Sequence, residues 1–170
     1  MSPLSRSDAI ALATAAGQAH ELVDQVIDGR ALRVFARAPR SLRAMFEEAA
    51  TGLPFLAYQD ERYTFAESWD QASRIGHVLV HRCGVKKGDR VAISMRNYPE
   101  WIFAFTAVLS IGAVAVAMNA HWQAEDMAYA LADSGAVVLL ADAERLDRWA
   151  QGPAVPGLQV LGVRAPTLPA

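Results

Sequence analysis

Two histidines and a cysteine lie close enough in the sequence to raise the question of a metal site. His77 and His81 are four residues apart, which would put both imidazoles on one side of a helix, and Cys83 follows shortly after. A zinc site needs a further ligand, and helical spacing places Cys83 on the apolar side, away from the histidines. We therefore favour two solvent-facing histidines and a small core cysteine over a metal site.

A run of arginines between residues 30 and 43 is the only charge cluster of note. It holds five arginines and no acid, so it is a candidate for binding phosphates or acidic lipid. We favour an extended connector whose arginines face water, because so short a run is usually a solvated surface. The whole chain has 16 basic and 18 acidic residues, a net charge of -2, which argues against a nucleic-acid partner.

Several motifs of phosphate and acyl chemistry are missing from the sequence. The turn after residues 90–95 is Met95-Arg-Asn-Tyr-Pro, which lacks the glycines that let a backbone approach a pyrophosphate. There is also no glycine-rich loop ending in Lys-Ser/Thr, no Gly-x-Ser-x-Gly nucleophile turn and no His-Glu-x-x-His. The sequence therefore names no catalytic residue and no metal ligand set.

The elements that would position any site follow from apolar spacing and caps. Thr64 and Glu67 form a capping box that starts a helix expected over 65–83. The other expected helices cover 8–28, 42–50, 99–111, 124–134 and 142–150. A hairpin is expected over 55–64, and the later strands over 90–95, 113–118, 136–141 and 158–163.

Strands that are apolar on both faces and alternate with helices predict an α/β fold. The expected fold is a mostly parallel sheet with helices on both faces, preceded by an N-terminal helix and a short β-hairpin. We divide the chain into an N-terminal helix and connector with a short helix (1–54), an α/β subdomain (55–163) and a frayed tail (164–170). The sequence contains no apolar run that would form a transmembrane segment, and only a faint imitation of a secretory signal, so we expect a cytoplasmic protein.

Five segments in order and in register resemble the N-terminal part of the AMP-forming acyl-CoA synthetases. This family also includes 4-coumarate-CoA ligases, luciferases and peptide-synthetase adenylation domains. Residues Asn119 to Trp122 look most like bacterial fatty-acid-CoA ligases. The segments are Tyr63-Thr-Phe-Ala-Glu-Ser, Gly84-Val-Lys-Lys-Gly-Asp-Arg-Val-Ala-Ile, Arg96-Asn-Tyr-Pro-Glu-Trp, Leu109-Ser-Ile-Gly-Ala-Val-Ala-Val-Ala-Met-Asn and Asp133-Ser-Gly-Ala.

The resemblance implies a partial N-terminal subdomain of the adenylate-forming fold and a two-step reaction. A carboxylic acid, here a fatty or other apolar acid, attacks Mg-ATP to give an acyl adenylate, and coenzyme A then displaces AMP. The family's Ser/Thr/Gly-rich loop ending in Lys, its later aromatic-Thr-Glu segment and its C-terminal lysine are not in this sequence. The resemblance therefore implies an N-terminal fragment that is inactive alone and binds ATP, magnesium or coenzyme A only weakly.

The same resemblance points to residues on the coenzyme A side. The loop after residues 113–118 carries Asn119 and His121, and the helix after the next strand carries Arg145 and Arg148 as candidate phosphate partners. The alternative for Asn119 is a loop residue that bonds to its own backbone. The alternative for both arginines is a solvated helix face.

Two other functional hypotheses stay open at this stage. One is a binding or assembly module that keeps the scaffold without the chemistry, and a flavodoxin-like nucleotide binder is a weaker one. A reading frame that continues into a Ser/Thr/Gly-rich segment ending in Lys would favour the ligase, and flavin absorbance would favour the third. We also expect self-association, because a sheet of this size leaves apolar edge and face uncovered.

Overall fold

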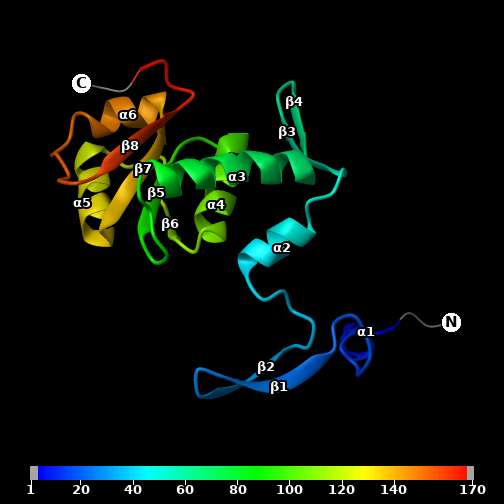
Figure 1. Ribbon diagram of the computed structural model, residues 1–170. Coiled ribbons are helices and arrows are strands. Elements are labelled where there is room, and N and C mark those ends of the chain that lie inside the picture. Colours follow the sequence, from blue (N-terminus) through cyan, green and yellow to red (C-terminus); the bar gives the residue numbers. More distant parts are fainter. Residues whose placement is uncertain (1–3, 168–170) are drawn as a thin grey trace. The chain divides into compact units, whose positions relative to one another are not determined.

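The computed structural model describes residues 4–167 (Figure 1). Contacts divide the chain after Ser41 into two compact units, which we call unit 1 (up to Ser41) and unit 2 (from Leu42). The sequence predicts a boundary at residue 54. The short helix α2 (Leu42–Glu48) belongs to unit 2 instead, because it packs against helix α4 (Pro99–Ser110).

Unit 2 is built around four parallel strands. They are β5 (Arg90–Ser94), β6 (Val114–Ala117), β7 (Ala136–Asp142) and β8 (Gln159–Val163), in the spatial order β6-β5-β7-β8. The central strands β5 and β7 are buried almost from end to end, as expected for a sheet that is covered on both faces. The predicted α/β fold with a parallel sheet is confirmed.

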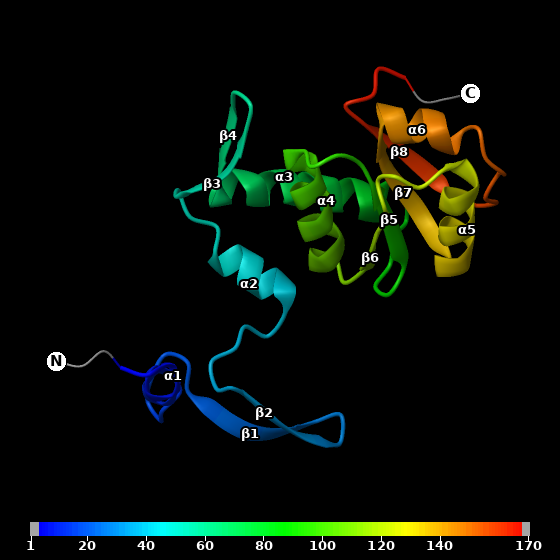
Figure 2. The same cartoon turned by 180° about the vertical axis from the view of Figure 1, so that it is seen from behind.

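Helices cover both faces of this sheet and give three layers (Figure 2). On one face, Val91, Ile93 and Leu140 pack against α4 and against α3 (Phe65–His81). On the other, Ala92 and Leu139 pack against α5 (Ala124–Ser134) and α6 (Ala143–Trp149). Alternate residues of β5 and β7 therefore pack into opposite layers, which is why these two strands are apolar on both faces.

A hairpin and a capped helix lead into this sheet. Strands β3 (Pro54–Tyr58) and β4 (Glu61–Thr64) pair antiparallel, and α3 starts directly after β4. The predicted capping box is confirmed: the Glu67 backbone N–H donates to Thr64 Oγ1 at 3.2 Å, and the Thr64 backbone N–H donates to Glu67 Oε2 at 2.8 Å. The cap fixes where the chain turns from strand into helix.

The segment after β8 is held in place at Arg164. Its guanidinium donates to both carboxylate oxygens of Glu61 (2.8 and 2.9 Å) and to Glu100 Oε1 at 2.8 Å, and it lies over the rings of Tyr58 and Tyr98. The prediction of a frayed tail from residue 164 is therefore wrong at Arg164, because the distant β3–β4 hairpin and the start of α4 supply its partners. Positions 168–170 of that tail lie outside the described residues.

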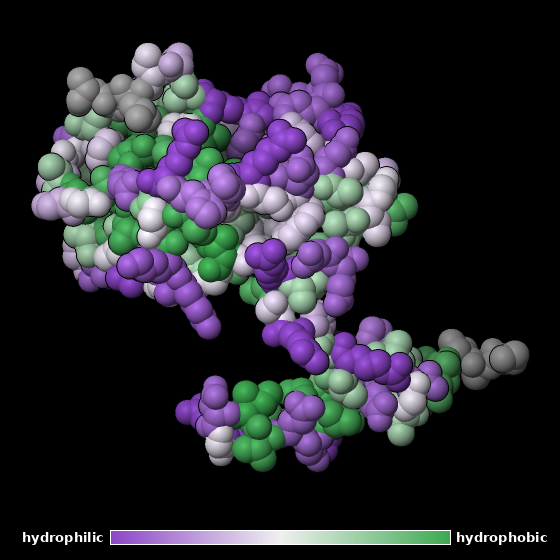
Figure 3. Space-filling view, in the orientation of Figure 1, coloured by the Kyte–Doolittle hydropathy of each residue, from purple (hydrophilic) through white to green (hydrophobic). Residues whose placement is uncertain are grey.

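Unit 1 consists of helix α1 (Arg6–Ala13) and the antiparallel pair β1 (Leu22–Ile27) and β2 (Arg30–Phe35). The predicted helix over 8–28 is wrong beyond its first turns, since the chain reverses at Asp28 and Gly29, both with positive φ. No residue from 4 to 41 is buried, and Figure 3 shows apolar side chains on the surface of the hairpin. Across the described residues, no helix has the length and apolar character needed to cross a membrane.

Candidate functional site

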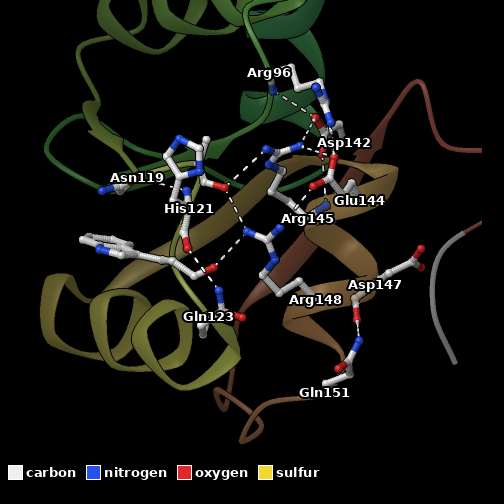
Figure 4. A network of polar contacts seen from close by, with 12 residues as sticks. Arg96, Asn119, His121, Gln123, Asp142, Glu144, Arg145, Asp147, Arg148 and Gln151 are labelled. Carbon is white, nitrogen blue, oxygen red and sulfur yellow. Dashed lines mark hydrogen bonds and ion pairs between the residues drawn. The ribbon is translucent and has the colours of Figure 1, made fainter.

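Three loops meet at the carboxyl ends of β5, β6 and β7. The chain leaves β5 toward the layer of α3 and α4, whereas it leaves β6 and β7 toward the layer of α5 and α6. Loops that diverge from neighbouring parallel strands open a crevice, which is where ligands of open α/β sheets bind. The candidate site therefore lies at this edge, and polar side chains from all three loops converge there (Figure 4).

Asp142, the last residue of β7, is the buried centre of this network. Its carboxylate accepts from the Arg145 backbone N–H at 3.0 Å and so caps the start of α6. It also accepts from the backbone N–H of Arg96 at 2.9 Å, which ties the β5 loop to the end of β7. Only 3% of Asp142 is exposed, so these bonds and Arg145 compensate a buried charge.

Glu144 gathers three arginines around one carboxylate. It accepts from Arg96 at 2.7 Å, from Arg145 at 2.9 Å and from Arg148 at 3.1 Å. The hydrogen bond from Arg96 is the largest cause that holds the pKa of Glu144 below its ordinary value, with smaller contributions from the other two arginines. The carboxylate therefore stays ionised and keeps the three cations together.

Arg145 and Arg148 hold the loop after β6 in place. Arg145 Nη2 donates to the carbonyl of Ala120 at 3.3 Å, and Arg148 Nη1 donates to the same carbonyl at 2.8 Å and to that of Trp122 at 3.0 Å. Arg145 is 5% exposed, so the alternative of a solvated helix face is wrong for it. Neighbouring carbonyls and carboxylates, rather than water, surround its guanidinium.

Asn119 and His121 lie on the loop that these arginines hold. Asn119 Oδ1 accepts from the backbone N–H of His121 at 2.9 Å, so the expected alternative of a loop residue bonding its own backbone is what the structure shows. The side chains of both residues are exposed at the sheet edge. The structure thus brings all four predicted site residues into one network, two as supports and two at the surface.

The surroundings of the two arginines decide whether they can bind a phosphate group. Arg145 and Arg148 already donate to carbonyls, and the carboxylates of Asp142 and Glu144 lie among them. An incoming phosphate would have to displace these bonds and approach two negative charges, so Arg145 does not fit direct phosphate binding. Arg148, whose side chain is 23% exposed, is the more accessible of the two, and contact with a coenzyme A phosphate stays a prediction.

The other candidate residues lie elsewhere. The rings of His77 and His81 lie tilted against each other with centroids 4.3 Å apart, and no group of three metal-ligating side chains exists in the described part of the chain. Cys83 packs against the core, where burial raises its pKa, as expected for a structural cysteine. Trp122 of the β6 loop packs against the apolar core beside α5 and α6.

Sequence reasoning missed three members of the network: Asp142, Glu144 and the structural role of Arg96. The available signal was their position, since each comes at or just after the end of a buried strand. Carboxyl ends of parallel strands meet at one edge, so polar residues there are close in space although far apart in sequence. The contact of Arg96 with Glu144 joins residues 48 positions apart.

The three-layer fold (Figure 2) and the loop network at one sheet edge define an α/β protein with a parallel sheet. The profile of a family described as AMP-binding enzyme matches residues 43–168. The chain belongs to this family, which confirms the resemblance seen in its sequence.

Named relatives agree with this assignment. The chain is 33% identical over 87 residues to a 2-succinylbenzoate–CoA ligase of Bacillus velezensis and 35% identical over 83 residues to a crotonobetaine/carnitine–CoA ligase of Escherichia fergusonii. These matches cover 51% and 49% of this chain but 18% and 16% of the relatives, so it spans less than a fifth of their length. The N-terminal domain of FACL13 from Mycobacterium tuberculosis matches with a TM-score of 0.66 and 30% identity, over 73% of this chain and 34% of that one.

Proposed function

We propose that this chain supplies the N-terminal scaffold of an enzyme that joins a carboxylic acid to coenzyme A through an acyl adenylate. The observation that carries the proposal is the match of residues 43–168 to the AMP-binding enzyme family, together with the parallel sheet whose loops converge at one edge. Both named relatives are CoA ligases. The chemistry on ATP would rest on residues that this sequence lacks.

The residues of this chain would act on the coenzyme A side of such an enzyme. Asn119 and His121 are exposed on the β6 loop and are the groups that a nucleotide could reach. Arg145 and Arg148 act as positioning residues, since they hold the carbonyls of that loop, and Arg148 is also the candidate phosphate contact. ATP and magnesium would bind through the remainder of the enzyme, where donors and a metal spread the charge of the reacting phosphates.

The acid that we propose is a fatty or other apolar acid. Its support is the sequence from Asn119 to Trp122, which resembles fatty-acid-CoA ligases. The relatives named above carry other acids in their names, 2-succinylbenzoate and crotonobetaine or carnitine, so an acid panel must include these types. We place the enzyme in the cytoplasm, where ATP and coenzyme A are available.

A graft tests the proposed role. Residues 43–168 would replace the matching segment of the crotonobetaine/carnitine–CoA ligase, and acyl-CoA formation would be measured. We expect the graft to retain activity and the same graft with Ile93→Asp, which breaks the core, to lose it. A folded, soluble graft without activity would contradict the scaffold role and favour a non-catalytic binding or assembly module.

The isolated chain provides the second measurement. With Mg-ATP and the acid panel, we expect no exchange of pyrophosphate into ATP, because no catalytic group of the family is in this sequence. Measurable exchange would refute the proposal that the chemistry lies on other residues.

Self-association is part of the same proposal. The edge strand β6 leaves Val114 47% exposed, and unit 1 exposes Val26 and Phe35. Exposed apolar surface of this kind favours contact between copies. Sedimentation should therefore show a dimer at high protein concentration, and a clean monomer would count against this part of the proposal.

A further inference from the structure

Two adjoining cavities follow the valley between α3 and α4, on the opposite side of the sheet from α5 and α6. The first has a volume of about 440 Å³ and the second of about 230 Å³, and Trp69 lines both. Helix α2 borders both cavities, through Met45, Phe46 and Ala49 at the first and Arg43 at the second. The two cavities meet at Trp69, and we call them together the α2–α4 groove.

The larger section of the groove is apolar. Its walls are mainly aromatic and aliphatic, and several of these side chains are partly open to solvent, with Met45 and Phe55 both 42% exposed. Its volume falls within the range of about 300–1,000 Å³ that is typical of small-molecule pockets. The main lining residues are Met45, Phe46, Phe65, Trp69, Ile102 and Phe105.

The smaller section carries cationic and donor groups. Arg43, His77 and His81 line it, and none of the three forms an ion pair with a carboxylate of the described residues. No acidic side chain lines this section. Ser110 also lines it, and its buried Oγ has no hydrogen-bond partner within the described residues. A guanidinium, two imidazoles and a hydroxyl together supply donors suited to an anion.

We propose that the α2–α4 groove binds a long-chain carboxylate, with its tail in the apolar section and its head group beside Arg43, His77 and His81. The charge pattern favours this occupant over a cationic amphiphile or an uncharged apolar one, since the groove is apolar at one end and cationic at the other. The polarity also fixes the direction of the ligand. The site lies away from the β6 loop, so it is a holding site for an acid rather than the coenzyme A side.

This proposal does not depend on the function proposed above. It concerns the residues that line the groove, which come mainly from α2, α3 and α4. It is tested by binding to the isolated chain, with no ATP, coenzyme A or remaining enzyme present. A failed graft with intact binding would overturn the scaffold role alone. A working graft without binding would overturn the groove alone.

The probe is dodecanoate, used below the concentration at which it forms micelles. Binding to the full chain would be followed by the NMR signals of the four tryptophan indoles, with the Trp69 signal assigned through a Trp69→Phe variant. We expect saturable binding that shifts the Trp69 signal. Each pair of methylenes removed from the acid should weaken binding about ten-fold, because less apolar surface is buried.

Two comparisons test the head group. Dodecyltrimethylammonium has the same tail and the opposite charge, and should bind at least ten-fold more weakly than dodecanoate. Arg43→Gln should weaken dodecanoate about ten-fold through loss of a charge-assisted hydrogen bond. Arg82→Gln is the matched control, since Arg82 is exposed on the same unit, lies outside the groove and changes the net charge equally.

A bulky side chain placed in the apolar section of the groove tests whether the tail of the ligand binds there. Ala49 is exposed and lines the apolar section, so Ala49→Trp should obstruct the tail and weaken dodecanoate at least ten-fold without disturbing the core. Ala66→Trp is its control, because Ala66 is exposed on α3 outside the groove. Thermal unfolding of each variant would confirm that it folds.

The outcomes are decisive in both directions. Weaker binding in Arg43→Gln and Ala49→Trp, with both controls unchanged, would support the site. Absence of saturation, equal binding of the cationic amphiphile, or equal binding in all four variants would each overturn it. NMR signals which show that a second copy of the chain already covers the groove would overturn the proposal. They would indicate an interface between copies instead.

Discussion

The two strand regions of this molecule contrast in what covers them. Strands β5 and β7 of unit 2 are buried from both sides by helices, whereas β1 and β2 of unit 1 form a two-stranded pair with no buried residue between positions 4 and 41. Two strands alone are marginally stable, since their apolar side chains gain little by pairing without a covering layer. Unit 2 therefore carries the core, and unit 1 depends on local bonds.

The ion pairs of the two units differ in the same way, since one is buried and the other is exposed. In unit 2, Arg145 is almost fully enclosed and bonds to a buried carboxylate and to a loop carbonyl. In unit 1, the pair of Arg33 and Asp24 spans 3.4 Å with both side chains more than 70% exposed. An exposed pair is screened by water and contributes little, whereas a buried pair leaves an uncompensated charge when it is broken.

Truncating a buried side chain of strand β5 should lower the free energy of unfolding the most. Ile93→Ala removes a fully buried side chain and should lower the free energy of unfolding by about 3 kcal/mol. Val26→Ala in β1, where the side chain is 74% exposed, should change it by less than about 0.5 kcal/mol. Urea unfolding followed by tryptophan fluorescence measures unit 2, because all four tryptophans lie in it, and circular dichroism recorded in the same titration registers unit 1 as well. Equal losses in both variants would contradict the contrast.

The buried ion pair should give the next largest effect. Arg145→Ala should cost about 3 kcal/mol, because Asp142 then stays buried without its cation, while Arg33→Ala should cost at most about 0.5 kcal/mol. Adding Asp142→Asn to Arg145→Ala should recover part of the loss, since the buried charge is removed. Urea unfolding followed by both fluorescence and circular dichroism measures all three variants. A double variant no more stable than the single one would show that packing, not charge, sets the cost.

The difference in burial between the two units also explains which elements can be predicted correctly from the sequence. From Thr64 onward, the capping box and the doubly apolar strands belong to a covered sheet, so local pattern and tertiary packing agree. Residues 22–27 have apolar positions that suit a helix or a strand, and helical spacing continued from α1 was misleading there. The Asp28-Gly29 turn, with φ of 49° and 76°, was the missed signal for a hairpin.

The candidate site was predictable only in part for a similar reason. Asn119, His121, Arg145 and Arg148 came from a family resemblance, and the structure does bring them together. Their roles depend on Asp142, Glu144 and Arg96, which approach through strand pairing. No local sequence pattern predicts that a carboxylate at the end of β7 will lie beside the loop after β5.

The helix caps allow a finer comparison. Thr64→Ala removes one half of the capping box of α3, a long helix packed on the core, and should cost about 1 kcal/mol. Ser5→Ala removes the equivalent cap of α1, which has no buried residue, and should leave the unfolding of unit 2 unchanged. Circular dichroism during urea unfolding would register both helices. A lower unfolding midpoint of unit 2 in Ser5→Ala would show that the stabilities of the two units are coupled.

Acid unfolding should reveal the smallest of these effects, at the same cap. The backbone N–H of Thr64 is the largest cause that lowers the pKa of Glu67 below its ordinary value of 4.5, and the Thr64 hydroxyl adds to it. A carboxylate whose pKa is lower in the folded state stabilises it above pH 4.5, and this contribution disappears as the pH falls through the lowered value. Glu67→Gln should therefore be less stable than the unchanged protein at pH 7, with the difference in stability narrowing below pH 4.5.

The control is Glu47→Gln, an exposed carboxylate with no hydrogen bond or ion pair to the described residues, which should show no such convergence. Parallel curves for Glu67→Gln and the unchanged protein from pH 7 to pH 3 would mean that the cap is made by the hydroxyl of Thr64 alone.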